Sequence, residues 1–170
     1  MMRRLLFPLI ALTAVLAGSK VRADFTFTSI DVPGAQSTYA AAINDLGQIV
    51  GSFCCSAKGF RYDGSTFTTI EIPGACSTSL TAINNSGQMI GRYVESSDCS
   101  EGARYDHTFL HDGTLWAVIE APGATATFAQ GINDAGVIVG YYSGASGIHG
   151  FSLDGPHSRR SIVPALATRT

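Results

Sequence analysis

The chain has 170 residues, of which 45% are hydrophobic and 14% are charged, and this composition fits one globular domain rather than a disordered chain. The formal net charge is −2, but four of the eleven basic residues precede Asp24 and all thirteen acidic residues lie at or after it. A product that begins at Asp24 would therefore carry a net charge of −6. Such an acidic protein argues against nucleic acid as the main partner.

Residues 1–23 predict a secretory signal peptide. Two arginines form a basic start, residues 5–17 are apolar, and Val21 and Ala23 stand where the small residues of a cleavage site are expected. An uncleaved anchor is the alternative, but this apolar stretch falls short of the ~20 residues that span a bilayer. We expect a secreted protein, extracellular or periplasmic, with no membrane span after cleavage.

Residues 24–170 contain one sequence unit written three times, and we expect them to form a single all-β repeat domain. Residues 26–51 match residues 66–91 at an offset of 40, with 15 of 26 positions identical. A third copy follows at an offset of 49, and its extra residues fall in a polar stretch that predicts a surface loop. The approximate repeats are 25–64, 65–113 and 114–155, followed by a degenerate tail, 156–170.

Each repeat predicts four short strands, because β-branched and aromatic runs alternate with turn residues and no helical period persists. In the second repeat the first strand, 67–72, ends at Pro-Gly, and the second strand covers about 77–83. An Asn-(Asp/Asn)-x-Gly turn leads into the third strand, 88–94, and the fourth strand, 108–111, ends at Asp-Gly. The repeated apolar positions expected in the core are Phe27, Phe67, Trp116, Ile43, Ile83, Ile132, Phe60, Phe109 and Phe151.

Four antiparallel strands in each repeat match the blade of a β-propeller, although propellers typically close with about four to eight blades. We favour a partial propeller-like stack of three repeats, either incomplete or completed by assembly. In its favour, the sequence from Asp154 to Ala165 echoes the start of a further unit. The alternative is a β-trefoil-like closure, in which three repeats fill one barrel and leave no edge.

The order of motifs resembles the HAF family of extracellular repeats. The resemblance covers nearly all of residues 24–154, although Lys58 stands where the other two repeats carry histidine. It implies a secreted, bacterial, propeller-like protein of no established activity. The residues that carry it are Ile43-Asn44-Asp45, Ile132-Asn133-Asp134, His107-Thr108-Phe109 and His149-Gly150-Phe151.

Export would place the four cysteines in an oxidising compartment, where disulfides persist. Cys76 follows a Pro-Gly-Ala turn, while Cys54, Cys55 and Cys99 lie between third and fourth strands, so all four are expected at one rim. A bond between the adjacent Cys54 and Cys55 is the least favourable because of its tight ring. We expect Cys99 to bond with Cys76 or with one of the adjacent pair, and the full connectivity stays open.

The sequence predicts no catalytic, cofactor-binding or metal site. It lacks G-x-S-x-G, S-x-x-K, H-E-x-x-H, a phosphate loop and any C-x-x-C pair. The Asn-Asp-x-Gly sequences could offer oxygen ligands to calcium, but without D-x-D-x-D spacing they favour turns. The recurring His107 and His149 similarly favour hydrogen bonds within the repeats over a ring of ligands.

The favoured function is a secreted, non-catalytic interaction or adhesion module for an unknown extracellular protein or glycan, and the protein could form homo-oligomers. A carbohydrate-binding, lectin-like domain is the first alternative, because aromatic residues at the ends of third strands could stack on sugar rings. An exported hydrolase is the second, and it needs His111 or His149 beside a carboxylate. The candidate ligand-binding surface contains Tyr93, Asp98, Tyr141 and Tyr142, and the inserted loop, 95–106, is expected to give specificity.

Overall fold

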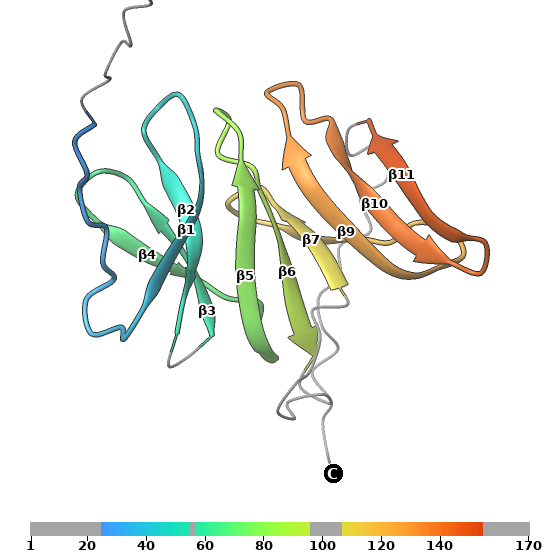
Figure 1. The fold of residues 1–170 in the computed structure, drawn as a ribbon, viewed down its shortest axis with the longest axis horizontal. Coiled ribbons are helices and arrows are strands. Elements are labelled where there is room, and N and C mark those ends of the chain that lie inside the picture. The colour runs from blue at the N-terminus through green and yellow to red at the C-terminus, as the bar shows by residue number, and fades with distance from the viewer. Residues whose placement is uncertain (1–24, 55–56, 96–106, 155–170) are drawn as a thin grey trace, which may run out of the picture.

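The computed structural model describes residues 25–54, 57–95 and 107–154, which form three antiparallel sheets that follow one another along the molecule (Figure 1). The first sheet contains β1 (Thr38–Ile43), β2 (Ile49–Phe53), β3 (Lys58–Tyr62) and β4 (Phe67–Ile70). The second contains β5 (Ala75–Ile83), β6 (Met89–Glu95), β7 (His107–His111) and β8 (Trp116–Ile119). The third contains β9 (Ala124–Ile132), β10 (Ile138–Gly144) and β11 (Gly147–Leu153). Across these ranges no helix is long and apolar enough to cross a membrane.

The prediction of an all-β fold is confirmed, and most strands lie within two residues of their expected positions. The first strand of the second repeat is shorter than expected, because β4 ends at Ile70 rather than at residue 72. The described residues form no closed barrel or ring, so the trefoil-like alternative is not found in them.

The sheets are out of phase with the sequence repeats. β4 belongs to the second repeat but pairs with β3 of the first, with Phe67 opposite Tyr62 and Ile70 opposite Gly59. β8, from the third repeat, pairs with β7 of the second in the same way. Each four-stranded sheet therefore takes its last strand from the following repeat. The expectation that each repeat forms its own four-stranded unit is therefore wrong. Two sheets have four strands drawn from two repeats, the described residues give the third sheet three strands, and residues 27–30 of the first repeat form no strand.

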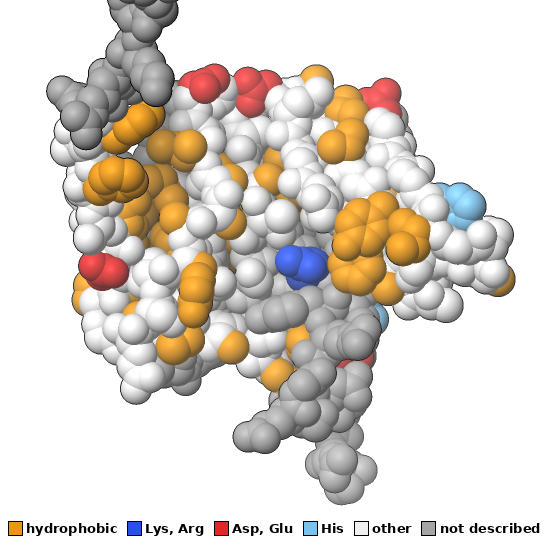
Figure 2. Space-filling model, in the orientation of Figure 1, with side chains coloured by type: hydrophobic (Ala, Val, Ile, Leu, Met, Phe, Trp, Pro, Cys, Tyr) orange, Lys and Arg blue, Asp and Glu red, His pale blue; other side chains and the backbone are white. Residues whose placement is uncertain are grey.

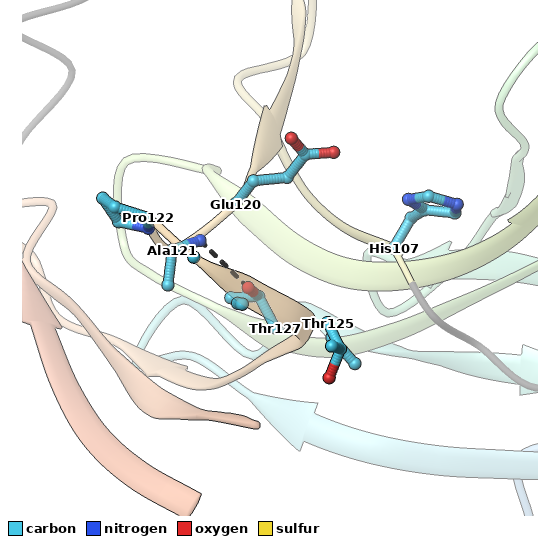
Figure 3. A pocket seen from close by; sticks show the side chains of 9 residues that line it. His107, Glu120, Ala121, Pro122, Thr125 and Thr127 are labelled. Atoms are coloured by element: carbon cyan, nitrogen blue, oxygen red, sulfur yellow. Dashed lines mark hydrogen bonds between the residues drawn. The ribbon is translucent and has the colours of Figure 1, made fainter. Parts of the chain in front are cut away.

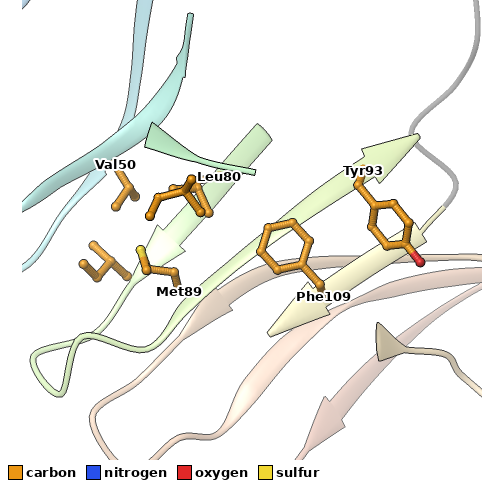
Figure 4. Packing of buried hydrophobic residues seen from close by; sticks show 7 residues of the cluster. Val50, Leu80, Met89, Tyr93 and Phe109 are labelled. Atoms are coloured by element: carbon orange, nitrogen blue, oxygen red, sulfur yellow. The ribbon is translucent and has the colours of Figure 1, made fainter. Parts of the chain in front are cut away.

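Two apolar clusters hold the sheets together. The first lies between the first two sheets, where Val50 meets Leu80 and Met89 (Figure 4), and the second lies between the second and third sheets around Ile90 and Ile138. The core prediction is confirmed for Phe60, Phe109 and Ile83, which are buried, while Phe67, Trp116, Ile132 and Phe151 are half-buried. It is wrong for Phe27 and Ile43, which are 93% and 65% exposed because no sheet covers them within the described chain.

The repeated Asn-(Asp/Asn)-x-Gly turns join successive sheets as well as turning the chain. The Asn44 side chain accepts the Gln48 backbone N–H at 2.9 Å, and its Nδ2 donates to the carbonyl oxygen of Asn84 at 3.0 Å. Asn84 repeats this pattern one sheet later, donating to the carbonyl oxygen of Asn133 at 3.0 Å. The prediction that these sequences form turns is confirmed, and we call the row of hydrogen bonds through Asn44, Asn84 and Asn133 the turn ladder.

The strands β2, β6 and β10 each carry a glycine directly after two apolar residues, and close packing of the neighbouring strand requires a glycine there. A Cβ at Gly91 would overlap the carbonyl oxygen of Ser79 on the neighbouring strand. The β5–β6 register shifts between Leu80 and Ala82, opposite this position. The recurring glycine therefore permits an irregular strand pair rather than a turn.

Candidate functional site

A cavity of about 400 Å³ opens where β7 begins and the β8–β9 loop turns (Figure 3). In Figure 3, His107 and Pro122 lie on opposite sides of the cavity, Glu120 lies above and between them, and Thr125 and Thr127 lie below. We call His107, Glu120 and the neighbouring Glu95 the rim corner. The rim corner combines an imidazole ring and two carboxylates, and of these His107 and Glu120 line the cavity while Glu95 lies beside His107.

The wall of the cavity is fixed by the Pro-Gly-Ala sequence and a threonine that follows it. The Ala121 backbone N–H donates to Thr127 Oγ1 at 3.0 Å, and the Ala124 N–H donates to the carbonyl oxygen of Ala121 at 3.1 Å. Gly123 has a φ of 74°, in the left-handed region that favours glycine. Equivalent threonines, Thr38 and Thr78, accept loop N–H groups in the other repeats, so this wall belongs to the scaffold.

The rim corner is acidic and partly aromatic. The His107 ring stacks on Tyr93 with 5.1 Å between ring centroids, and its Nε2 lies 3.8 Å from Glu95 Oε1. Burial raises the pKa of Tyr93, and the negative charges of Glu95 and Glu120 raise it further. A ligand at this corner meets negative charge that the protein leaves accessible, since the Glu95 side chain is 54% exposed.

The equivalent corner of the first sheet is closed by an ion pair. Lys58 occupies the position of His107, Glu71 occupies that of Glu120, and the Lys58 ammonium contacts the Glu71 carboxylate. In the second sheet His107 pairs with Glu95 instead, and among the described ion pairs Glu120 has none. The substitution of histidine for lysine thus leaves a carboxylate facing the cavity.

The structure separates the residues predicted for the ligand surface. Tyr93 is only 9% exposed and packs in the first apolar cluster. Tyr141 and Tyr142 are half-buried on β10, where Tyr141 stacks on Phe128 at 5.0 Å and Tyr142 lies 5.3 Å from the His149 ring. Asp98 lies outside the described residues. Glu120 and Thr125 were not predicted, although an acidic residue before every Pro-Gly-Ala, at Asp31, Glu71 and Glu120, was the available signal.

The two other described histidines, His111 and His149, have local partners. His111 is buried, its ring stacks on Trp116 with 3.9 Å between centroids, and its Nδ1 lies 3.0 Å from the carbonyl oxygen of Leu115. His149 Nε2 lies 2.8 Å from the Ser146 hydroxyl oxygen. In the described part of the chain neither has a carboxylate at ion-pair distance. Nor do three or more metal-ligating side chains gather anywhere in that part.

The loops of the two described cysteines, Cys54 and Cys76, lie side by side as the sequence predicted, since the Thr78 N–H donates to the carbonyl oxygen of Ala57 at 2.8 Å. The Cys54 backbone N–H donates to the carbonyl oxygen of Ser37 in the neighbouring loop at 3.0 Å, and Cys76 Sγ lies 3.0 Å from the carbonyl oxygen of Glu95. No disulfide joins Cys54 to Cys76. Cys55 and Cys99 lie outside the described residues, so the pairing of Cys99 stays a prediction.

Comparison with known proteins adds no relative to this picture. Neither the models of protein families nor the curated proteins match the chain. The geometry of the rim corner is therefore the main structural indication of function.

Proposed function

We propose that the chain is a secreted, non-catalytic interaction module that holds an extracellular partner at the rim corner. The observation that carries this proposal is the accessible carboxylate pair, Glu95 and Glu120, around the His107 ring beside an open cavity. The predicted signal peptide and the resemblance to HAF repeats support the extracellular setting. The binding groups stand on or beside strands, which keeps them rigid before the partner arrives.

The chemistry of the corner favours a partner with positive charge or several hydrogen-bond donors. Two carboxylates accept hydrogen bonds from lysine, arginine or hydroxyl groups, and such charge-assisted bonds are the stronger ones. Thr125 adds a hydroxyl, whose oxygen lies 3.0 Å from the Ser143 hydroxyl oxygen. A basic segment of an extracellular protein is therefore the first class of partner that we propose.

The inserted segment supports the same location. Glu95 and His107 flank residues 96–106, the segment that distinguishes the second repeat in length from the first. His107 lines the cavity, and the Glu95 carboxylate lies 3.8 Å from the His107 ring. Loops on rigid β scaffolds commonly carry binding specificity.

A carbohydrate-binding function is the second candidate, and a different observation favours it. Phe128 and Tyr141 stack across β9 and β10, and the Arg92 guanidinium lies 6.0 Å from the Phe128 ring centroid. Hydrophobic side chains are visible on the face over these strands (Figure 2). Aromatic rings beside polar groups are suited to stacking on sugars.

Binding of lysine- and arginine-containing peptides and of a glycan array would test both functions. We expect peptide binding that weakens at least tenfold in Glu120→Gln, which keeps the side-chain volume but removes the charge. Glu71→Gln, at the equivalent position of the first sheet, is the matched control and should bind as the wild type does. Glycan binding lost in Tyr141→Ala but kept in Glu120→Gln would transfer the function to the carbohydrate candidate. Absence of both signals would contradict an interaction module with this chemistry.

A further inference from the structure

Within the described residues, the third sheet has an exposed edge strand where the first and second sheets each carry a fourth strand. In the first and second sheets, β4 and β8 pair with β3 and β7. In the third sheet β11 is the equivalent of β3 and β7, and within the described residues it is the edge strand. An open edge presents unpaired N–H and C=O groups to any strand that fits it.

The same chain carries a segment with the sequence of the missing strand. Residues 27–30, Phe-Thr-Ser-Ile, stand 40 positions before β4, Phe-Thr-Thr-Ile, and match it at three of four positions. Yet residues 25–30 form no strand, and Phe25 and Phe27 are 77% and 93% exposed. The equivalent Phe67 packs between Phe60 and Tyr62, with ring centroids 5.6 and 4.5 Å away.

The outer faces of the first and third sheets expose apolar side chains whose equivalents elsewhere in the chain are buried between sheets. Val139 of β10 is 48% exposed, whereas its equivalents Val50 and Ile90 are completely buried under the sheet that follows them. Ile43 of β1 is 65% exposed, whereas its equivalent Ile83 is 6% exposed because a sheet precedes it. Within residues 25–54, 57–95 and 107–154, therefore, no sheet follows the third sheet and none precedes the first. Figure 2 shows hydrophobic side chains at both ends of the molecule.

We propose that two copies of the chain associate head to tail, residues 27–30 of each adding a strand to β11 of the other and the first sheet of each covering the third sheet of the other. Two copies would then place six sheets in one ring, within the range in which propellers close. The two junctions would be identical and related by a two-fold axis. This assembly depends on residues 27–30, on β11 and on the outer faces of the first and third sheets, and it is independent of the proposed function.

The proposal fixes the register of the new strand pair. Because Phe67 lies opposite Tyr62 and Ile70 opposite Gly59, Phe27 should lie opposite Leu153 and Ile30 opposite Gly150. Leu153, which is 39% exposed, would then be covered.

The same register places further equivalent residues across the junction. The Lys58–Glu71 ion pair links β3 to the residue after β4, and the equivalent residues at the junction are His149 of one copy and Asp31 of the other. The turn ladder would also continue, since Asn133 could donate to Asn44 of the second copy as Asn44 donates to Asn84.

A second copy fits the edge better than the other parts of one chain. The first and third sheets lie at opposite ends of the molecule in Figure 1, so one copy does not bring residues 27–30 to its own β11. The tail offers Ser-Arg-Arg-Ser, residues 158–161, at the spacing after Asp154-Gly155 where β8 follows Asp112-Gly113. These residues lack the apolar side chains shared by residues 27–30, β4 and β8.

The junction would differ from the internal ladder in one respect. Within the chain, the Asn85 Nδ2 donates to Asp45 Oδ2 at 2.8 Å and to Asp134 Oδ2 at 2.7 Å, so an amide separates the two carboxylates. Between copies, Asp134 would face Asp45 directly. Asp45→Asn should therefore tighten the dimer several-fold, since Asn can still accept the bond from Asn85 and can donate to Asp134.

Sedimentation equilibrium of the mature protein tests the assembly. We expect a dimer at micromolar concentration, with a dissociation constant raised at least tenfold in Phe27→Asp and in Val139→Asp. Leu115→Asp is the matched control, because Leu115 is 38% exposed on the middle sheet and lies at neither end. A monomer, a longer polymer or a dimer unaffected by Phe27→Asp would overturn the proposal.

Mixing the two variants tests the head-to-tail arrangement. Phe27→Asp damages one end and Val139→Asp the other, so a mixture should recover dimers through the one junction whose two surfaces are both intact. Failure to recover them would overturn the head-to-tail geometry in favour of edge-to-edge pairing. Because Phe27 lies outside the rim corner, peptide binding by the Phe27→Asp monomer separates failure of this proposal from failure of the proposed function.

Discussion

The middle sheet and the two end sheets are built from the same sequence unit, yet they bury equivalent residues to different extents. Ile83 and Ile90 of the middle sheet are 6% and 0% exposed, whereas Ile43 and Val139, their equivalents at the two ends, are 65% and 48% exposed. The difference arises because neighbouring sheets, and not the repeat itself, cover these positions. In a repeat protein a buried sequence pattern therefore describes an interface that needs a neighbour.

The largest expected contrast is between Ile90→Ala and Val139→Ala, at the same position of two strands. Ile90 is completely buried, so its truncation should leave a cavity and lower the free energy of unfolding by about 2–5 kcal/mol. Val139→Ala should cost less than about 1 kcal/mol in the monomer, because half-exposed side chains gain less from burial. Urea unfolding at several protein concentrations measures both. Equal losses at low concentration would contradict the difference in cover.

The next largest effect on stability is expected from removing the predicted disulfide of Cys99, whose partner is either Cys76 or one of Cys54 and Cys55. If Cys99 is bonded as predicted, its loss should lower the free energy of unfolding by about 2–4 kcal/mol. Peptide mapping without reduction should find the Cys99 peptide joined to that of Cys76 or to the one carrying Cys54 and Cys55. Alkylation of Cys99 in the unreduced, unfolded protein would show the prediction to be wrong.

The turn ladder gives a smaller contrast, between Asn84 and Asn133. Asn84 is 3% exposed and bridges two turns, so Asn84→Ala should cost about 1–3 kcal/mol by leaving backbone groups unsatisfied. Asn133 is exposed, and its side chain accepts the Val137 N–H at 2.9 Å, so Asn133→Ala should cost about 1 kcal/mol or less. Hydrogen exchange of the Gln88 and Val137 amides locates each loss. An equal effect of both substitutions would contradict a ladder anchored in the middle sheet.

The smallest effect on stability is expected at the exposed turn between β3 and β4, the strand that the second repeat contributes to the first sheet. Backbone N–H groups of Thr66 and Ser65 donate to Asp63 and hold its pKa below the ordinary value of 3.8. The ionised carboxylate therefore adds stability above that value, and the contribution disappears as pH falls through the lowered pKa. Asp63→Asn should be slightly less stable than the wild type at pH 7, with the difference shrinking in acid. A difference that stays constant with pH would contradict this assignment.

Local sequence predicted the strands and turns but not how strands combine into sheets. The Asn84 turn and the β6 strand follow from local residue types, and both occur where expected. The partner of β4 could not be read from its own residues, because pairing with β3 is a contact between repeats. Phe27 was predicted in the core for the same reason: its pattern is that of Phe67, but its neighbour is missing from the described part of the chain.

The candidate site was predicted only in part. His107 and the inserted segment were singled out by comparing repeats, whereas Glu120 was not, because the rim corner forms from loops of two different repeats. Tyr93 was a candidate for the ligand surface, although aromatic residues at strand ends more often pack in a core, and it is buried because its ring packs under His107 and beside Phe109. The sequence at the end of a strand does not show which side chain of a neighbouring strand will cover its residues.

Because the fourth strand of each four-stranded sheet comes from the following repeat, the repeated sequence unit and the folded sheet begin and end at different residues. A repeat that begins with a strand of the preceding sheet completes that sheet, and its own sheet takes a fourth strand from the repeat that follows. Cutting the chain between β3 and β4 would separate a sheet from its closing strand, even though the cut falls near a boundary between repeats. Lengthening such an array is therefore structurally simple, whereas ending it requires something to occupy the last vacancy.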